Sequence, residues 1–273
     1  MKKRRRWFVG IKIYSILALI PILFTVFGCF MGEIELAQYY NVNAEGYLKP
    51  HFIPEYFTLE QFRSVLFDTP DYLYQFWNSV ALLVPGVLLA LLVSVTGGYA
   101  LAKCRIPARR SLELTYLLVL LLPVQITLVP QFILFYQIHL TGTRLAMLLL
   151  ISFSPMGTLL MQHFIAKVPQ ETLESARIDG AREWTILFRV VLPQIWYGVA
   201  GLAILLMVDV WEMVEQPLVL LTKNSYPFSV TLSHLSASQP SVIFVCGLIY
   251  MIPMLLLFGI LGEQFGESMD AIF

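Results

Sequence analysis

The sequence predicts an all-α membrane protein with six transmembrane helices, as its composition, its apolar runs and the placement of its charges indicate. Of the 273 residues, 58% are hydrophobic and 13% are charged, whereas in a soluble domain about a quarter of the residues are charged. One soluble core could not bury so many apolar side chains, but in a bilayer these side chains can face lipid. The formal net charge of zero leaves no basic surface for nucleic acid.

Six apolar segments are long enough to span a bilayer, whose core of about 30 Å takes roughly 20 helical residues to cross. The third carries Pro123, Pro130 and Gly142, which must bend or end its helix. The fifth is expected to continue past Asp209 to about Leu221. The predicted spans are residues 13–31, 76–102, 114–143, 145–166, 190–208 and 242–261.

Lysine and arginine residues lie mostly on one side of these spans, and this asymmetry sets the orientation. With the basic residues 2–6 in the cytoplasm, fourteen of the 18 basic residues fall inside and four outside. Both termini are therefore predicted to be cytoplasmic. The alternative is a cleaved signal peptide with a lipoprotein-like box at 26–29. The first apolar run is longer than the usual 7–15 residues of such a peptide, which favours a retained span.

The predicted parts of the chain differ in composition. The segment between the first two spans is acidic and rich in aromatic residues, which suits either a membrane interface or a docking surface. The parts are a basic N-terminus with the first span (1–31), an external loop (32–75), a five-helix core (76–262) containing a cytoplasmic loop at 167–194, and a short cytoplasmic tail (263–273).

Motifs for catalysis, for nucleotide binding and for metal binding are missing from the sequence. There is no GxxxxGK[ST] phosphate loop, no HExxH and no GxSxG. The three cysteines have no CxxC spacing, so they are most simply interpreted as small apolar residues. We therefore expect no enzyme activity, no metal and no cofactor on this chain, and any ATP must be hydrolysed by another subunit.

The cytoplasmic loop at 167–194 has the pattern of two short helices joined by a glycine. Gly180 follows a helical segment, and glycine most readily takes the left-handed conformation that ends a helix. Trp184, Leu187 and Val191 are spaced to form one apolar stripe on the second helix. The pattern predicts either a rigid docking element or an amphipathic loop that lies on the lipid surface.

The residues of this loop resemble the EAA loop of binding-protein-dependent ABC importer permeases. That loop reads Glu-Ala-Ala, three residues, Gly, nine residues, then Ile-x-Leu-Pro. In this chain Ser175 replaces an alanine and Val190 replaces the isoleucine. The matching positions are Glu174, Ser175, Ala176, Gly180, Val190, Val191, Leu192 and Pro193.

The resemblance extends to the carbohydrate (maltose-type) branch of these permeases. That branch has a Trp-Asn-x-x-x-x-Pro-Leu pattern in the fifth span, which appears here from Trp211 to Leu218 with Glu212 in place of the asparagine. The last residues, 269–273, depart from the tail usual in the family, which puts a contact between this tail and the ATPase subunits in doubt.

The resemblance implies a type I ABC importer permease fold in the bacterial cytoplasmic membrane. Its partners would be a second permease in a heterodimer, two ATPase subunits that hold ATP and magnesium, and an external solute-binding protein. The loop at 167–194 would couple ATP hydrolysis to transport. The residues expected to make this contact are Glu174, Ser175, Ala176, Asp179, Gly180, Leu192 and Pro193.

Polar residues in the fifth span are candidates for the translocation pathway. At 100° per residue, Asp209, Glu212 and Gln216 lie on one side of a continuous helix, and buried carboxylates in membranes usually face polar cavities. Trp211 is expected to stack on a sugar ring. The alternative places the carboxylates in water at the outer interface. Asn78 and Gln125 are weaker candidates, because lone amides in spans more often bond a neighbouring helix.

The expected cargo is a sugar or oligosaccharide. A peptide, a polyol or glycerol phosphate is the close alternative within the same family. A secondary transporter driven by ions could use the carboxylates of the fifth span as a proton relay, but it would have no use for an EAA loop.

Overall fold

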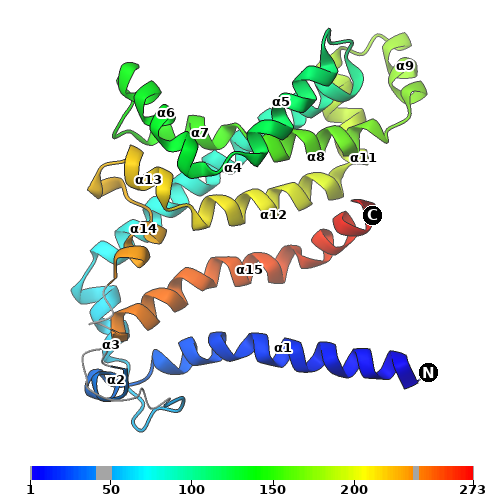
Figure 1. The fold of residues 1–273 in the computed structure, drawn as a ribbon. Helices are drawn as coiled ribbons and strands as arrows, with labels where there is room; N and C mark the ends of the chain where they lie inside the picture. The colour runs from blue at the N-terminus through cyan, green and yellow to red at the C-terminus, as the bar shows by residue number, and fades with distance from the viewer. Residues whose placement is uncertain (1, 41–50, 236–239, 273) are drawn as a thin grey trace. The chain divides into compact units, whose positions relative to one another are not determined.

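A computed structural model describes residues 2–40, 51–235 and 240–272, and every regular element in these ranges is a helix (Figure 1). The chain divides into two compact units. One comprises Met1–Phe76 and Thr231–Pro253, and the other comprises Trp77–Val230 and Met254–Phe273. Each unit is described by itself.

Three helical stretches in the described residues are long and apolar enough to cross a membrane, or up to 5 when each of two bent pairs counts as one span. The three are α4 (Asp71–Lys103), the stretch Arg144–Ala166 formed by α7 (Arg144–Ser152) and α8 (Pro155–Ala166), and the part Pro240–Ile260 of α15 (Pro240–Ile272). In α1 (Lys2–Gly28), the apolar part Tyr14–Gly28 is shorter. The arrangement of six spans with both termini in the cytoplasm therefore stays a prediction.

Proline bends the third apolar segment, as the sequence predicts. Helix α5 (Arg109–Leu121) ends just before Pro123, and α6 (Val124–Gln137) continues at 105° to it. Pro130 lies inside α6 without ending it, and Gly142 takes a left-handed φ of 78° beyond its end.

The helix in the fifth predicted span is shorter than predicted at both ends. α12 spans Trp196–Glu212, whereas the sequence suggested a helix from 190 that runs to about 221. The preceding helical stretch, Glu183–Gln194, meets α12 at 86°. At the other end Met213 is extended (φ −61°, ψ 124°), and the chain re-enters a helix only at α13 (Glu215–Leu220). These breaks cannot be recognised from the hydrophobic pattern, because apolar residues predominate on both sides of each break.

In the larger unit, small residues allow α4 and α12 to approach α8 closely. A Cβ atom on Gly98 would lie 2.7 Å from the backbone nitrogen of Gln162, and one on Gly198 would lie 2.7 Å from the Phe164 ring. Glycines at such crossings are typical of helix packing in membranes. The largest apolar cluster joins these three helices to the loop at 167–194.

The smaller unit contains the described part of the segment between α1 and α4. Gln61 in α3 (Glu60–Arg63) is buried and donates a hydrogen bond to the carbonyl of Met31. The amide of Thr58 donates to the carbonyl of Phe30 at 3.0 Å. These bonds hold the segment against the end of α1. Four other short elements of the described residues lie outside residues 167–194: α2 (Glu33–Tyr40), a π turn (Ser64–Asp68), a 3₁₀ turn (Lys223–Ser225) and α14 (Phe228–His234).

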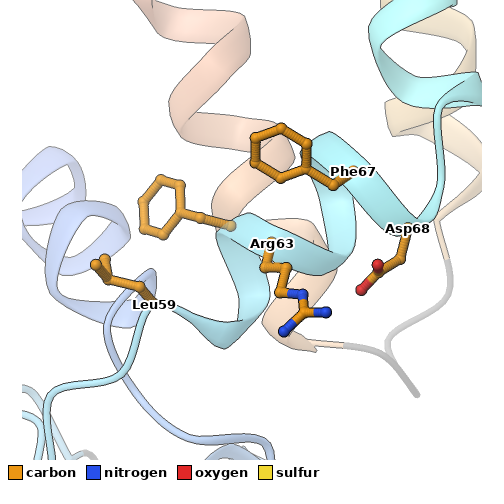
Figure 2. A pocket seen from close by; sticks show the side chains of 5 residues that line it. Leu59, Arg63, Phe67 and Asp68 are labelled. Carbon is orange, nitrogen blue, oxygen red and sulfur yellow. The ribbon is translucent and has the colours of Figure 1, made fainter.

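An open pocket of about 620 Å³ lies beside α3 and the π turn (Figure 2). Phe67 is 77% exposed, and Arg63 and Asp68 are exposed as well. The pocket therefore combines accessible apolar surface with both signs of charge. Its lining residues are Leu59, Phe62, Arg63, Phe67 and Asp68.

Candidate functional site

The loop at 167–194 folds into two helical parts around Gly180, as the sequence predicts. The first helix, α9, spans Gln170–Ile178, and Gly180 follows it with φ 80°. The amide of Gly180 donates to the carbonyl of Arg177, and the amide of Ala181 donates to that of Ala176, both at 3.0 Å. This pair of bonds is a Schellman motif, which needs a residue in the left-handed conformation.

The second half of the loop begins with α10 (Glu183–Thr185) and continues through a π turn (Ile186–Val191) into α11 (Leu192–Gln194). Leu187 and Val191 are buried, as the predicted stripe requires, but Trp184 is 64% exposed. Ile186 is buried in its place. The π turn has more residues per turn than an α-helix, so it shifts the phase of the apolar face.

One side of the loop faces the core. Leu173 is fully buried, and Ala176 and Leu192 pack against the same apolar cluster. Ala176 and Leu192 therefore support the loop from within, whereas Pro193 is exposed at the start of α11.

The opposite side of α9 is exposed and holds most of the predicted coupling residues. Glu174, Ser175, Asp179 and Gly180 are all exposed. Ile178 is 86% exposed beside them, and the sequence reasoning missed it. Ile178 lies four residues after Glu174, so the two side chains share one face of the helix. This spacing is the signal from which the exposure of Ile178 could have been predicted.

Polar contacts join the loop to the end of α4, and these too were missed. The hydroxyl of Tyr99 donates to Glu183 Oε2 at 2.5 Å, and Arg177 Nε donates to Glu183 Oε1 at 2.9 Å. Lys103 Nζ donates to the carbonyl of Val168 at 2.6 Å. The bonds from Arg177 and Tyr99 hold the pKa of the Glu183 carboxyl below its usual value, so the carboxylate is charged at neutral pH.

The pathway candidates of the fifth span separate into different environments. Asp209 and Glu212 are exposed on the surface of α12 and lie three residues apart on one side of the helix. Trp211 is 3% exposed, so its ring is packed inside the fold, and its stacking on a sugar stays a prediction. Gln216 belongs to α13, beyond the break at Met213. It therefore does not share a helix face with Asp209, as the sequence predicted for a continuous helix.

The two weaker candidates are held by hydrogen bonds. Asn78 is 2% exposed, and its amide nitrogen donates to the carbonyls of Asn224 and Tyr226 at 3.0 and 3.2 Å. Its oxygen accepts from Arg144 at 2.6 Å. Asn78 therefore ties the segment after α13 to α4. Gln125 is exposed and donates to the carboxylate of Glu215 at 2.8 and 3.2 Å.

Asn78→Ala is expected to destabilise the protein measurably. The change removes three hydrogen bonds of a buried side chain, each with a net contribution of about 0.5–1.5 kcal/mol, or about 1.5–3 kcal/mol where the partner is charged. The midpoint of thermal unfolding in detergent should fall, whereas Gln125→Ala, which removes an exposed amide, should hardly change it. Equal midpoints for the two variants would contradict the role given to Asn78.

The described residues contain no group of three or more histidine, cysteine, aspartate or glutamate side chains placed to hold a metal ion. The polar side chains described above interact through hydrogen bonds and ion pairs. The exposed face of the loop at 167–194 and the carboxylates of α12 therefore remain the candidate functional surfaces.

The sequence profile of the family "Binding-protein-dependent transport system inner membrane component" matches residues 64–270. The chain belongs to this family. It is therefore a multi-pass permease of the inner membrane, and the resemblance inferred from residues 174–193 is confirmed.

Individual relatives resemble the permease over most of its length. The arabinooligosaccharides transport system permease protein AraQ of Halalkalibacterium halodurans is 29% identical over 216 residues, which cover 79% of this chain and 75% of that protein. The diacetylchitobiose uptake system permease protein NgcG of Streptomyces coelicolor is 24% identical over 266 residues, covering 94% and 84%.

A solved structure shares the fold of the permease. It belongs to a bacterial ABC transporter involved in the import of the acidic polysaccharide alginate. The TM-score is 0.81 at 20% identity, and the match covers 97% of this chain and 98% of the other. The helical permease fold predicted from the sequence is confirmed.

Proposed function

We propose that this permease forms half of the membrane pathway of an ATP-driven importer for a sugar or oligosaccharide. The observation that carries the proposal is the loop at 167–194, whose inner side is packed into the core while its outer side is exposed. A self-sufficient carrier has no use for such a surface. The relatives named for arabinooligosaccharide transport and diacetylchitobiose uptake support a carbohydrate cargo.

The outward face of α9 is the proposed contact with an ATPase subunit. Ile178 would enter an apolar cleft of that subunit, and Glu174, Ser175 and Asp179 would bond around it. An exposed apolar side chain encircled by polar groups is the arrangement of an interface hot spot. The ATPase subunits would supply the ATP and magnesium.

A second permease would complete the pathway. Asp209 and Glu212 are exposed on the surface of α12, and a charged side chain at the bilayer centre costs about 2.5–3.5 kcal/mol on insertion scales. A polar pathway shared with a second permease would avoid this cost. On the outer side, the pocket beside Arg63 and Phe67 offers apolar and charged contacts to a solute-binding protein.

Co-purification followed by uptake measurements tests the proposal. The tagged permease, purified from gently solubilised membranes, should bring with it an ATPase and a second permease. Reconstituted with the binding protein, this complex should take up an arabino-, chito- or malto-oligosaccharide only when ATP is supplied. Transport by the permease alone without ATP would favour a secondary carrier, and ATP-driven uptake of peptides alone would refute the sugar assignment.

Ile178→Glu should remove the ATPase from the purified complex and reduce ATP-driven uptake at least about tenfold, because losing a hot spot costs about 2 kcal/mol or more. Ile34→Glu is a matched control, since Ile34 is 85% exposed on α2. Both variants should insert equally well. Retention of the ATPase by the Ile178 variant would exclude this residue from the contact.

A further inference from the structure

Two residues near the end of α4 hold both ends of α9. Tyr99 bonds Glu183, which follows α9, and Lys103 bonds the carbonyl of Val168, which precedes it. Tyr99 and Lys103 are four residues apart, so they share one face of α4. The helix α9 is therefore bracketed by two contacts to a single turn of α4.

Glu183 also links this turn to α9 directly. Its second oxygen accepts from Arg177, which lies in the last turn of α9. The path from α9 to α4 is therefore Arg177 to Glu183 to Tyr99. Tyr99 is 5% exposed, so the hydroxyl at the end of this path is fixed in one place.

These polar contacts are not required to hold the loop in the protein. The apolar cluster that contains Leu173, Leu187 and Val191 already does so. The side chains of Arg177 and Glu183 are 36% and 54% exposed, and such an ion pair contributes about 0–1 kcal/mol. Hydrogen bonds have preferred distances and angles, so these bonds define the orientation of α9 against α4 in addition to the apolar contacts.

We propose that Tyr99 and Lys103 are positioning residues that make α4 move as one body with α9, so that a displacement of the loop is delivered to this spanning helix. The inference rests on the proposed function, in which an ATPase displaces α9. In addition, α4 receives the movement of α9 through the hydrogen bonds of Tyr99 and Lys103.

Distances between two spin labels test this inference in the assembled complex. One label is placed on Gln170→Cys in α9 and the other on Leu92→Cys in α4, both at exposed positions, with the exposed Cys104 changed to serine. The distance is measured without nucleotide and after trapping with ATP and vanadate. With Tyr99 present, the distance should be the same in both states. In Tyr99→Phe, it should shift or broaden on trapping.

Several outcomes overturn the inference. A distance that changes on trapping with Tyr99 present shows that α9 and α4 do not move together. A distance that stays constant in Tyr99→Phe shows that the hydroxyl transmits nothing. A residue that only stabilises the fold would lower the yield of complex without producing a shift that depends on nucleotide.

Three further variants complete the experiment. Glu183→Gln removes the charge of the central acceptor and should give the same shift as Tyr99→Phe. The double variant should add little, because both changes break one path. Tyr197→Phe changes a half-exposed tyrosine at the start of α12 and should leave the distance constant. Absence of any ATPase from the complex would instead refute the proposed function.

Discussion

Gly180→Arg is expected to abolish ATP-driven uptake while the permease still inserts into the membrane. Gly180 has φ 80°, and no atom outside its chain neighbours lies within 4 Å of the place where a Cβ would be. The Cβ of an arginine would therefore have free space, and the left-handed conformation costs about 1–2 kcal/mol. Its long cation would project from the surface proposed to contact the ATPase.

Two variants separate strain from obstruction at this position. Gly180→Ala carries the same backbone strain with one added carbon, so it should retain most of the uptake. Gly32→Arg adds the same side chain at another position where a Cβ has free space, and uptake should be normal. The measurement is uptake per inserted permease in proteoliposomes. Equal loss of uptake in the alanine and arginine variants would show that the backbone turn, and not the contact surface, is what matters.

Gly98→Ala is expected to reduce the amount of folded permease severely. The new Cβ would lie 2.7 Å from both the backbone nitrogen of Gln162 and the Cβ of Met161. Because one obstacle is backbone, α4 and α8 would have to separate along their crossing. Overpacking of this kind costs about 1–3 kcal/mol, occasionally more.

The preceding residue provides the control for this experiment. A Cβ on Gly97 would lie 3.1 Å from the Thr158 methyl group, and a side chain can shift more easily than backbone. The yield of monodisperse protein in detergent and its midpoint of thermal unfolding should therefore fall much further for Gly98→Ala than for Gly97→Ala. Equal effects would indicate that α4 and α8 are not locked at this crossing.

The helical fold and the loop could be predicted because their signals are local. Long apolar runs require helices in lipid. The turn at Gly180 depends on its own conformational preference and on bonds to neighbours in sequence. The bend at Pro123 is local in the same way, since proline lacks the amide that a continuing helix needs.

Part of what the sequence did not reveal has a different origin, because it depends on contacts between distant segments. Trp211 belongs to a pattern of its branch, but its burial is decided by how α12 packs. Asn78 bonds carbonyls more than a hundred residues away, and a lone amide in a span predicts a bond to another segment without indicating which one. The exposure of Trp184 follows from a π turn, which leaves no signature in the hydrophobic pattern. The hydrophobic pattern does not indicate the break at Met213 either.

The short length of α9 bears on how tightly the permease can hold a partner. A helix of nine residues is mostly unfolded when isolated in water. Here its end is capped at Gly180, and Leu173 anchors it in the core. Because the helix is ordered in advance, binding does not carry the cost of fixing its backbone, which is about 1–2 kcal/mol per residue. A small contact surface can therefore give a durable complex.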